Sequence, residues 1–257
     1  MRARPADSFD DQVVLVTGAA SGIGRATAQA FHERGAHVVG WDLNVESLEA
    51  QGGDWTLIQG VDVCDAEAVC EAVAEIETRC GRIDILVSNA GRADVSPIAD
   101  CSPEQFRAAL EINLVSHQLV ASQVVQLMHR VGQGGCLLFN ASKSAFNPGP
   151  EFGPYSIPKA GVVALMKQYA VEYGGDGIRA NAVNADRVRT GLFGDGMLER
   201  RAEARGLSVE AYLSGNLLKR EVTVDDVAMA FVALAQQRAT TGAVLPVDGG
   251  NIAASPR

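Results

Sequence analysis

The chain has 257 residues and a formal net charge of −9 at pH 7, with 47% hydrophobic and 21% charged residues. This composition is typical of a globular protein, and no run approaches the roughly 18 apolar residues of a membrane helix. The acidic charge disfavours nucleic acid as a partner, because phosphate binding needs a basic face. Residues 1–11 lack the apolar stretch of a signal peptide. We therefore expect one cytoplasmic domain over residues 1–257, with no nucleic-acid or membrane partner.

Short apolar runs alternate along the chain with helical or irregular segments. Strands that alternate with helices pair in parallel, because parallel neighbours need crossover connections. The sequence therefore predicts an α/β fold, a single Rossmann-type doubly wound parallel sheet of about seven strands with helices on both faces. The expected strands are residues 12–17, 37–41, 55–61, 83–87, 135–140, 178–184 and 243–247, and two expected helices are residues 22–34 and 153–173.

Residues 190–220 interrupt this alternation with an irregular, charged stretch that contains five glycines. A connection of this length without a regular pattern is often a functional loop. We expect it to cover a substrate site.

Cysteines and histidines follow no pattern that predicts a metal site. The cysteines are odd in number without a C-x-x-C pair, and the histidines show no H-x-x-H spacing. We expect no metal and five reduced, mostly buried thiols: Cys64, Cys70, Cys80, Cys101 and Cys136.

A run of small residues lies where the first strand meets the first helix, from Thr17 to Gly24. Such residues let the backbone approach a pyrophosphate at the helix N-terminus, although a structural tight turn is the alternative. Asp42 ends the second strand, where a carboxylate accepts hydrogen bonds from the adenosine ribose and repels a 2′-phosphate. Taken alone, Asp42 is also consistent with a solvated loop charge. Together, the two features favour NAD over NADP.

Tyr155 and Lys159 are four residues apart in a predicted helix, which places them on one face. Free tyrosine has a pKa of about 10, and a nearby ammonium lowers it enough for proton transfer at neutral pH. Pro158 is tolerated in the first turn of a helix, where its missing N–H matters little. We therefore predict Tyr155 as the acid/base, near the start of its helix, with Lys159 tuning its pKa.

The T-G-x-x-x-G-x-G turn, the Y-x-x-x-K pair and the ending Val247-Asp248-Gly249-Gly250 resemble the short-chain dehydrogenase/reductase family from residue 12 to 251. The resemblance implies reversible hydride transfer between a nicotinamide and an alcohol or carbonyl, in a dimer or homotetramer. It also supports NAD, because Ala19, Ala20 and Leu43 replace the basic residues of NADP-dependent members. The implied cofactor-binding residues are Gly18, Ser21, Gly22, Ile23, Gly24, Asp42, Asp62, Val63, Asn89, Ala90, Gly91, Tyr155, Lys159, Val188 and Thr190.

The resemblance also implies two further catalytic positions. Ser142 lies 13 residues before Tyr155 and would orient the substrate oxygen, with Ser144 as the weaker candidate. Asn113 matches the helical asparagine that helps the lysine hold a proton-relay water, and its alternative is a helix-kink or buried hydrogen-bonding residue.

The chain departs from the family pattern at two places. Ser88 replaces the first asparagine of the motif that continues as Asn89-Ala90-Gly91, and Ala185-Asp186 replaces the usual Pro-Gly after the sixth strand. The second change puts the local backbone geometry in question.

The substrate is less defined by the sequence. Residues 146–150, 184–187 and 215–218 resemble the dehydrogenase half of bifunctional rhamnulose-1-phosphate aldolase/alcohol dehydrogenases, which suggests a small hydroxy-aldehyde or sugar-derived substrate. Five arginines lie between residues 187 and 205, in the predicted substrate segment. A guanidinium group is well suited to bind a carboxylate or phosphate. An anionic substrate is therefore one hypothesis, with Ser142, Arg187 and Arg189 as contacts. The alternative is a solvated amphipathic helix in which Arg200, Arg201 and Arg205 alternate with Asp195, Glu199 and Glu203.

The sequence thus predicts an NAD-dependent oxidoreductase acting on the CH–OH group of a small polar substrate. One alternative is a non-catalytic NAD-sensing protein of the same fold. Others are a 3-oxoacyl carrier-protein reductase and an epimerase or dehydratase that works through transient oxidation.

Overall fold

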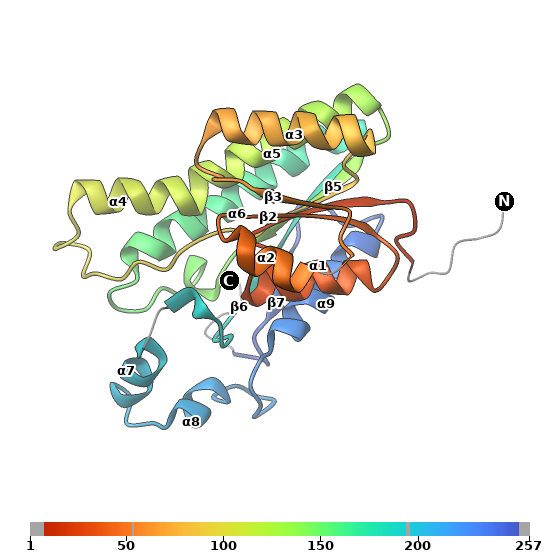
Figure 1. Cartoon of the computed structure of the whole chain (residues 1–257). Helices are drawn as coiled ribbons and strands as arrows, with labels where there is room; N and C mark the ends of the chain where they lie inside the picture. The colour runs from red at the N-terminus through yellow and green to blue at the C-terminus, as the bar shows by residue number, and fades with distance from the viewer. Residues whose placement is uncertain (1–7, 53, 194–195, 252–257) are drawn as a thin grey trace.

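A computed structural model of the chain describes residues 8–52, 54–193 and 196–251. Strands from these residues form one seven-stranded parallel sheet in the order β3-β2-β1-β4-β5-β6-β7 (Figure 1). The predicted doubly wound α/β fold is confirmed. The strands are β1 (Val13–Thr17), β2 (His37–Asp42), β3 (Leu57–Gly60), β4 (Ile85–Ser88), β5 (Gly135–Asn140), β6 (Ile178–Ala185) and β7 (Val244–Val247).

Helices cover both faces of the sheet (Figure 1). Helices α3, α5 and α6 pack on one face, and α1, α2 and α9 pack on the other. The helices are α1 (Gly22–His32), α2 (Val45–Gly52), α3 (Ala66–Cys80), α4 (Pro103–Leu110), α5 (Ser116–Val131), α6 (Gly153–Tyr173), α7 (Met197–Glu203), α8 (Val209–Leu213) and α9 (Val224–Gln236).

The strands read as continuous apolar runs because both faces of the sheet are buried. In β1, Val13 and Leu15 join the core beneath α3, α5 and α6, whereas Val14 and Val16 join the core beneath α1 and α9. Each fully buried side chain of this size contributes about 1.5–3 kcal/mol. An all-parallel sheet therefore shows no alternation of polar and apolar residues.

Strand β1 is the point from which the chain winds in both directions. It pairs with β2 on one side and with β4 on the other. In open parallel sheets, ligands bind in the crevice at the carboxyl ends of the strands at such a switch point. The fold therefore places the site where β1 and β4 end.

Two strands begin two residues later than the sequence suggested, β3 at Leu57 and β4 at Ile85. Before β4, the Asp84 carboxylate accepts the Val13 N–H at 2.9 Å, so a side chain replaces a ladder hydrogen bond at this point. Before β3, the ring of Trp55 packs against Gly40, where an added Cβ would come within 2.8 Å of the ring.

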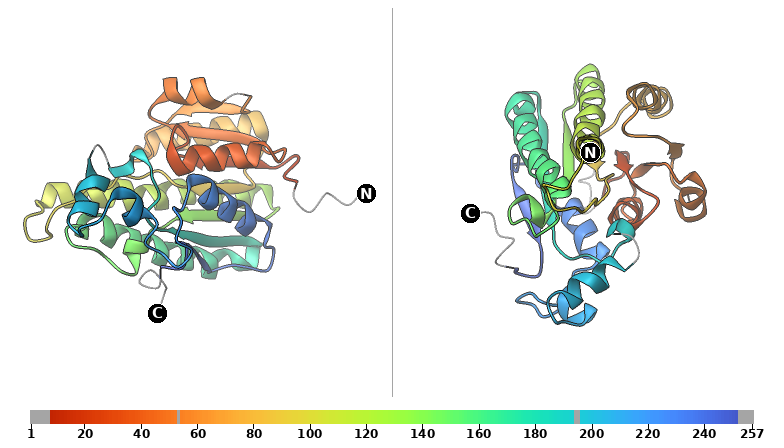
Figure 2. Two further views of the ribbon diagram at one scale, coloured as in Figure 1. Left: turned by 90° about the horizontal axis from the view of Figure 1, so that it is seen from below. Right: turned by 90° about the vertical axis from the view of Figure 1, so that its left-hand side faces the viewer.

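Residues 190–220 are more regular than expected. They contain α7 and α8, which pack against each other around Ala202, Tyr212 and Leu213 and project to one side of the sheet (Figure 2). The prediction of an irregular stretch was wrong, because this segment has its own small apolar core. Asp195 lies outside the described residues.

Two smaller predictions were also wrong. Only Cys136 is buried, whereas most of the five cysteines were expected to be. Cys70 in α3 is exposed, and the other three cysteines are half-buried. Pro158 is the sixth residue of α6, beyond the first turn, because the helix begins at Gly153. Its missing N–H would have faced the carbonyl of Pro154.

None of the helices in the described ranges is long and apolar enough to cross a membrane. The same ranges contain no group of three or more His, Cys, Asp or Glu side chains arranged to hold a metal.

Candidate active site

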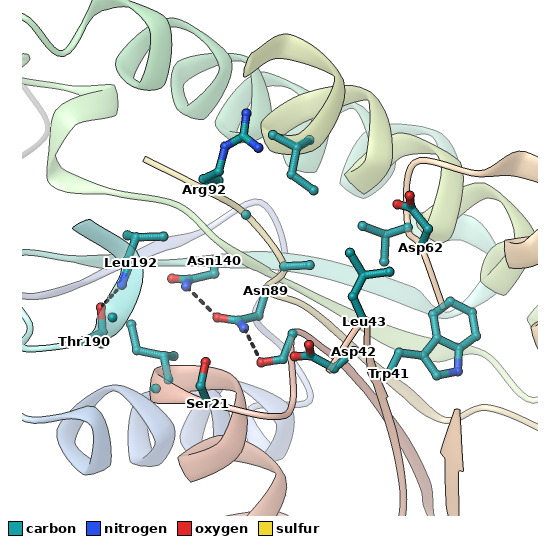
Figure 3. Close-up of a pocket in the computed structure, with 18 of the residues that line it drawn as sticks. Ser21, Trp41, Asp42, Leu43, Asp62, Asn89, Arg92, Asn140, Thr190 and Leu192 are labelled. Carbon is teal, nitrogen blue, oxygen red and sulfur yellow. Dashed lines mark hydrogen bonds between the residues drawn. The ribbon is translucent and has the colours of Figure 1, made fainter. Parts of the chain in front are cut away.

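A cavity of about 430 Å³ opens at the carboxyl ends of β1, β2 and β4 (Figure 3). The predicted cofactor-binding residues converge on it from six separate segments. Two of them do not line it: Gly24 packs inside the turn, and Val188 lines a neighbouring cavity. Those that line it are Gly18, Ser21, Gly22, Ile23, Asp42, Asp62, Val63, Asn89, Ala90, Gly91, Tyr155, Lys159 and Thr190.

The glycine turn forms the floor of this cavity before α1. Gly18 has φ +67°, and a Cβ there would lie 3.1 Å from the Cα of Ala90. At Gly24, a Cβ would lie 2.0 Å from the Gly18 carbonyl oxygen, so this glycine is needed to close the turn. Ser21 is the N-cap of α1 but its side chain makes no capping hydrogen bond. The first N–H groups of α1 therefore remain available to an anion at the helix N-terminus.

Asp42 lies half-buried at the end of β2, on the wall of the cavity. Its carboxylate accepts hydrogen bonds from the N–H of Ala20 at 3.0 Å and of Asn44 at 2.9 Å. The basic side chains among the lining residues are Arg92 and Lys159. Arg92 is paired with Asp94 at 3.0 Å.

The turn after β4 is fastened to the end of β1. Thr17 Oγ1 accepts the N–H groups of Asn89 at 2.9 Å and Ala90 at 3.0 Å, and Asn89 Nδ2 donates to the Thr17 carbonyl. The Asn140 amide donates to Asn89 Oδ1 at 2.8 Å (Figure 3).

Asn140 also provides a test of ligand fit. Its Oδ1 is buried and has no hydrogen-bond partner in the described part of the chain. Buried acceptors are rarely left unpaired, so this oxygen is suited to a donor on a bound group. Together with the glycine turn and Asp42, the residues present fit a nicotinamide dinucleotide.

Tyr155 and Lys159 line this cavity, and Ser142 lies beside Tyr155. Tyr155 is the third residue of α6 and 5% exposed, so the prediction that it lies near the helix start is confirmed. Lys159 Nζ donates to the Asn140 carbonyl at 2.9 Å and lies 5.8 Å from the centroid of the Tyr155 ring. Tyr155 also forms a side-chain hydrogen bond with Ser142.

The pKa of Tyr155 differs from the expectation. Burial raises the pKa of Tyr155 to about 12, and the hydrogen bond with Ser142 opposes that rise. Burial lowers the pKa of Lys159 to about 7. The predicted lowering of the Tyr155 pKa was therefore wrong for this structure, because desolvation of the phenolate is the largest effect.

Comparison with known proteins identifies the family to which the chain belongs. The sequence model described as enoyl-(acyl carrier protein) reductase matches residues 18–251. The chain belongs to the short-chain dehydrogenase/reductase family. It is 36% identical to D-threitol dehydrogenase from Mycolicibacterium smegmatis, over 94% of this chain and 93% of that protein.

Two further likenesses bear on length and cofactor. The chain is 33% identical to the oxidoreductase YuxG of Bacillus subtilis, over 99% of this chain but only 39% of that protein. The crystal structure of 3-ketoacyl-(acyl-carrier-protein) reductase from Brucella melitensis complexed with NADH matches with a TM-score of 0.85 and 29% identity, over 95% of this chain and 99% of that one. The family uses nicotinamide cofactors.

His117 contacts Lys159, and no motif in the sequence indicated this contact. It is 1% exposed on α5, with Nδ1 2.6 Å from Ser88 Oγ and Nε2 3.5 Å from Lys159 Nζ. Burial, and secondarily Lys159, lower the pKa of His117 well below 6.5, so the ring is neutral. A neutral ring that accepts from the Lys159 ammonium at Nε2 carries its proton on Nδ1, facing Ser88. The only sequence signal was serine in place of asparagine at residue 88.

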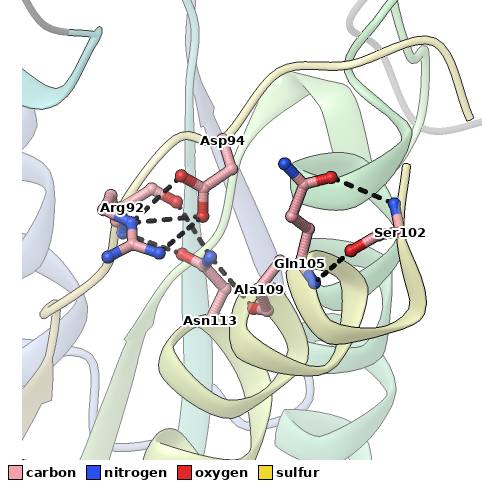
Figure 4. A network of polar contacts seen from close by, with 6 residues as sticks. All are labelled: Arg92, Asp94, Ser102, Gln105, Ala109 and Asn113. Atoms are coloured by element: carbon pink, nitrogen blue, oxygen red, sulfur yellow. Dashed lines mark hydrogen bonds and ion pairs between the residues drawn. The ribbon is translucent and has the colours of Figure 1, made fainter. Parts of the chain in front are cut away.

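The side chain of Asn113 forms hydrogen bonds within this short-chain dehydrogenase/reductase. It is fully buried in a π-helical turn, Glu111–Val115, between α4 and α5. Its side chain accepts the Arg92 N–H at 3.0 Å and donates to the carbonyls of Arg92 and Ala109 (Figure 4). The side chain lines neither cavity described, so the buried hydrogen-bonding alternative describes it, and the relay role stays a prediction.

A second cavity of about 90 Å³ adjoins the first and shares Asn140 and Tyr155 with it. Ser142, Ser144 and Val188 line it, as does Arg187. Ser144 donates to Ser142 Oγ at 3.0 Å and so supports the serine nearer Tyr155.

The arginines predicted near the substrate separate into two groups. Arg187, Arg201 and Arg205 line the second cavity. Arg189 lines neither cavity and pairs with Glu221 at 3.1 Å on the surface, so the structure does not bring it to the site. Lys143 also lines the second cavity, and sequence reasoning missed it.

The Asp186 replacement is accommodated without disrupting the site. Asp186 is buried and accepts a hydrogen bond from Asn251, which ties the end of β6 to the segment after β7. The left-handed backbone position falls on Arg187, with φ +52°.

Proposed function

We propose that this protein is an NAD-dependent oxidoreductase that transfers a hydride between the nicotinamide and a small polar alcohol or carbonyl compound. The observation that carries the proposal is the position of Tyr155, which lies on the wall shared by the two cavities and in contact with Ser142. When bound, the dinucleotide supplies or accepts the hydride.

The side chains have separate tasks in this proposal. Ser142 hydrogen-bonds the substrate oxygen and sets its distance from Tyr155. Tyr155 takes the hydroxyl proton during oxidation and returns it during reduction. Lys159, in its protonated form, favours the phenolate of Tyr155 and offers donors to the ribose. Burial of both groups excludes water from the proton transfer.

Preference for NAD rests on Asp42. Its carboxylate lies where a 2′-phosphate would meet negative charge, and no lysine or arginine among the described lining residues lies beside it to neutralise that charge. The crystal structure of the relative from Brucella melitensis is a complex with NADH, which supports an unphosphorylated cofactor for this chain.

The substrate proposal rests on the size and polarity of the second cavity. Its 90 Å³ and its serine, lysine and arginine side chains favour a small polar molecule over a long acyl chain. This weighs against a 3-oxoacyl carrier-protein reductase. The presence of Tyr155 beside Ser142, with Lys159 near its ring, weighs against a non-catalytic NAD sensor.

The resemblance to rhamnulose-1-phosphate aldolase/alcohol dehydrogenases stays a prediction. It agrees with a polyol-like substrate, as does the likeness to D-threitol dehydrogenase. The chain spans less than half the length of YuxG. The expected dimer or homotetramer, the single domain and the cytoplasmic location stay predictions as well.

The test is a panel of small polyols, deoxy sugars, hydroxy acids and aldehydes, assayed by the absorbance of reduced nicotinamide with NAD and with NADP. We expect turnover with at least one polar alcohol and a higher kcat/KM with NAD. Tight NADH binding without turnover across the panel would favour the sensor, and a preference for NADP would contradict the role given to Asp42.

A further inference from the structure

The second cavity carries an excess of positive charge although the whole chain is acidic, with a net charge of −9. Its only carboxylate among the described lining residues is Asp186, and this group is already engaged by Asn251 and by Arg187 at 3.7 Å. The cationic side chains on the same wall are Lys143, Arg187, Arg201 and Arg205.

Two of these arginines are held by the protein backbone. Arg187 Nη1 donates to the Tyr212 carbonyl at 2.9 Å, and Arg205 Nη1 donates to the Arg201 carbonyl at 2.9 Å. Their guanidinium groups also lie over the Tyr212 ring, at 4.6 Å and 5.3 Å from its centroid. Arg187 and Arg205 therefore help to build the wall.

Arg201 is held differently, because its contacts leave the end of the guanidinium free. Its Nε donates to the Tyr212 hydroxyl at 3.1 Å, and its guanidinium carbon lies 4.1 Å from the centroid of the Phe152 ring. No carboxylate in the described ranges pairs with it. The two terminal nitrogens thus remain as donors in a fixed plane, which suits bidentate binding of a carboxylate or phosphate.

The position of Arg201 relates it to the reacting hydroxyl. The Phe152 ring that it covers packs edge-on against Tyr155, with centroids 5.9 Å apart. Gly149 lies on the other side, where a Cβ would come within 3.3 Å of Arg201 Nη2. This glycine does not have a positive φ, so the backbone does not require it, and its missing side chain leaves the guanidinium open.

Lys143 adds a second cation beside Ser142. It is half-buried, and its ammonium has no hydrogen-bond or ion-pair partner in the part of the chain that the structure describes. A half-buried cation without a counter-charge is stabilised when an anion binds next to it.

We propose that the substrate is a small hydroxy compound with an anionic group, carboxylate or phosphate, which Arg201 binds with Lys143 as the second cation. The hydroxyl carbon then faces Ser142 and Tyr155. This inference rests on the proposed function and names the substrate class of the same site. Oxidation of the CH–OH group to C=O gives its hydride to NAD and its proton to the phenolate form of Tyr155, and the anionic group is unchanged.

The kinetic test compares matched substrates that differ only in charge: a neutral polyol, the corresponding phosphate monoester and the corresponding hydroxy acid. We expect the anionic members to have at least about tenfold higher kcat/KM with the wild-type enzyme, and the better of the two identifies the group. Loss of one charge-assisted bidentate contact weakens binding by about ten- to a hundredfold.

The decisive variant is Arg201→Met, with Arg200→Met as its control, because Arg200 is exposed on the same helix and lines neither cavity. Arg201→Met is expected to lower the ratio of kcat/KM for the anionic substrate to that for the neutral polyol at least about tenfold, mainly through a higher KM for the anionic substrate, while Arg200→Met keeps the wild-type ratio. Arg201→Lys, which keeps the charge but not the fork, should give an intermediate KM. Lys143→Met supplies a second variant if the first folds poorly.

A second measurement does not depend on turnover. Inorganic phosphate and oxalate, added at constant ionic strength to the NADH-loaded protein, should raise the thermal midpoint of the wild type and of Arg200→Met but not of Arg201→Met. Equal use of neutral and anionic alcohols, with no effect of Arg201→Met, would overturn the anionic subsite while the proposed function stands. Absence of any NAD-linked turnover would overturn the proposed function, and anion protection that requires Arg201 would then still support the subsite.

Discussion

The two adjoining cavities are built in different ways. The walls of the larger one are backbone turns at the ends of parallel strands, such as Gly18 after β1 and Asn89 after β4, fastened together by Thr17. The wall of the smaller one includes the charged and aromatic side chains of Arg201, Arg205 and Tyr212 from the α7–α8 segment. Backbone geometry restricts which residue types are allowed, so the cofactor cavity has a recognisable sequence pattern. The substrate cavity is set by side-chain contacts that leave no such pattern.

The largest effect is expected at Lys159, which belongs to the backbone-defined cavity. Lys159→Met should lower kcat by about 10²–10⁴-fold, because Tyr155 loses its neighbouring cation. The same change should raise the free energy of unfolding at pH 7 by up to roughly 4 kcal/mol, because burial lowers the pKa of the ammonium from 10.5 to about 7 without a carboxylate partner. Thermal unfolding and activity assays measure the two effects.

The pH dependence distinguishes this explanation from general repacking. A lowered pKa in the folded state means that wild-type stability falls as the pH drops from 10.5 toward 7. The stability gain of Lys159→Met should therefore shrink as the pH approaches 10.5. A variant less stable than the wild type at neutral pH would show that the buried ammonium stabilises the fold.

A smaller effect is expected at Asp42, and it should be confined to one cavity. Asp42→Ala should lower kcat/KM for NAD by about ten- to a hundredfold, because the ribose loses a charged acceptor. Activity with NADP should fall less or rise, and the KM of the alcohol should stay constant. Asp42→Asn removes the charge but keeps an oxygen for the Ala20 N–H, so it separates cofactor choice from stability of the turn. An equal loss with both cofactors would refute the assignment.

The smallest effect concerns His117, which lies behind Lys159. Because its folded pKa lies well below 6.5, the unfolded chain binds more protons, and stability should decrease as the pH falls below 6.5. The slope from this one group is at most about 1.4 kcal/mol per pH unit. His117→Gln keeps a polar side chain toward Ser88 and Lys159 but does not titrate. Chemical unfolding measured between pH 5 and 6.5 should therefore show a shallower dependence of stability on pH for this variant. An unchanged slope would contradict a neutral buried ring.

The sequence predicted the fold well because hydrophobic runs and parallel pairing depend on local pattern. Helix α6 was predicted with both ends correct, and the glycine turn and Tyr155 were found from their spacing. Strand starts differed by two residues where Asp84 and Trp55 replaced regular pairing.

Features that depend on contacts between distant residues were not predictable. Ser88 and His117 are 29 residues apart, and serine in place of asparagine at residue 88 does not indicate which side chain it contacts. Arg189 and Arg201 look alike along the chain, but Glu221 pairs with Arg189 while Phe152 and Tyr212 hold Arg201. The raised pKa of Tyr155 likewise follows from burial, which spacing does not reveal.

The central claim is that Tyr155 joins the two cavities as the acid/base, and Tyr155→Phe tests it most directly. With the best alcohol from the panel, kcat should fall by about 10²–10⁴-fold, while the Kd for NADH, measured by nicotinamide fluorescence, should change little. This result would separate chemistry from binding at a side chain that lines both cavities. Activity within a few-fold of the wild type would contradict the account.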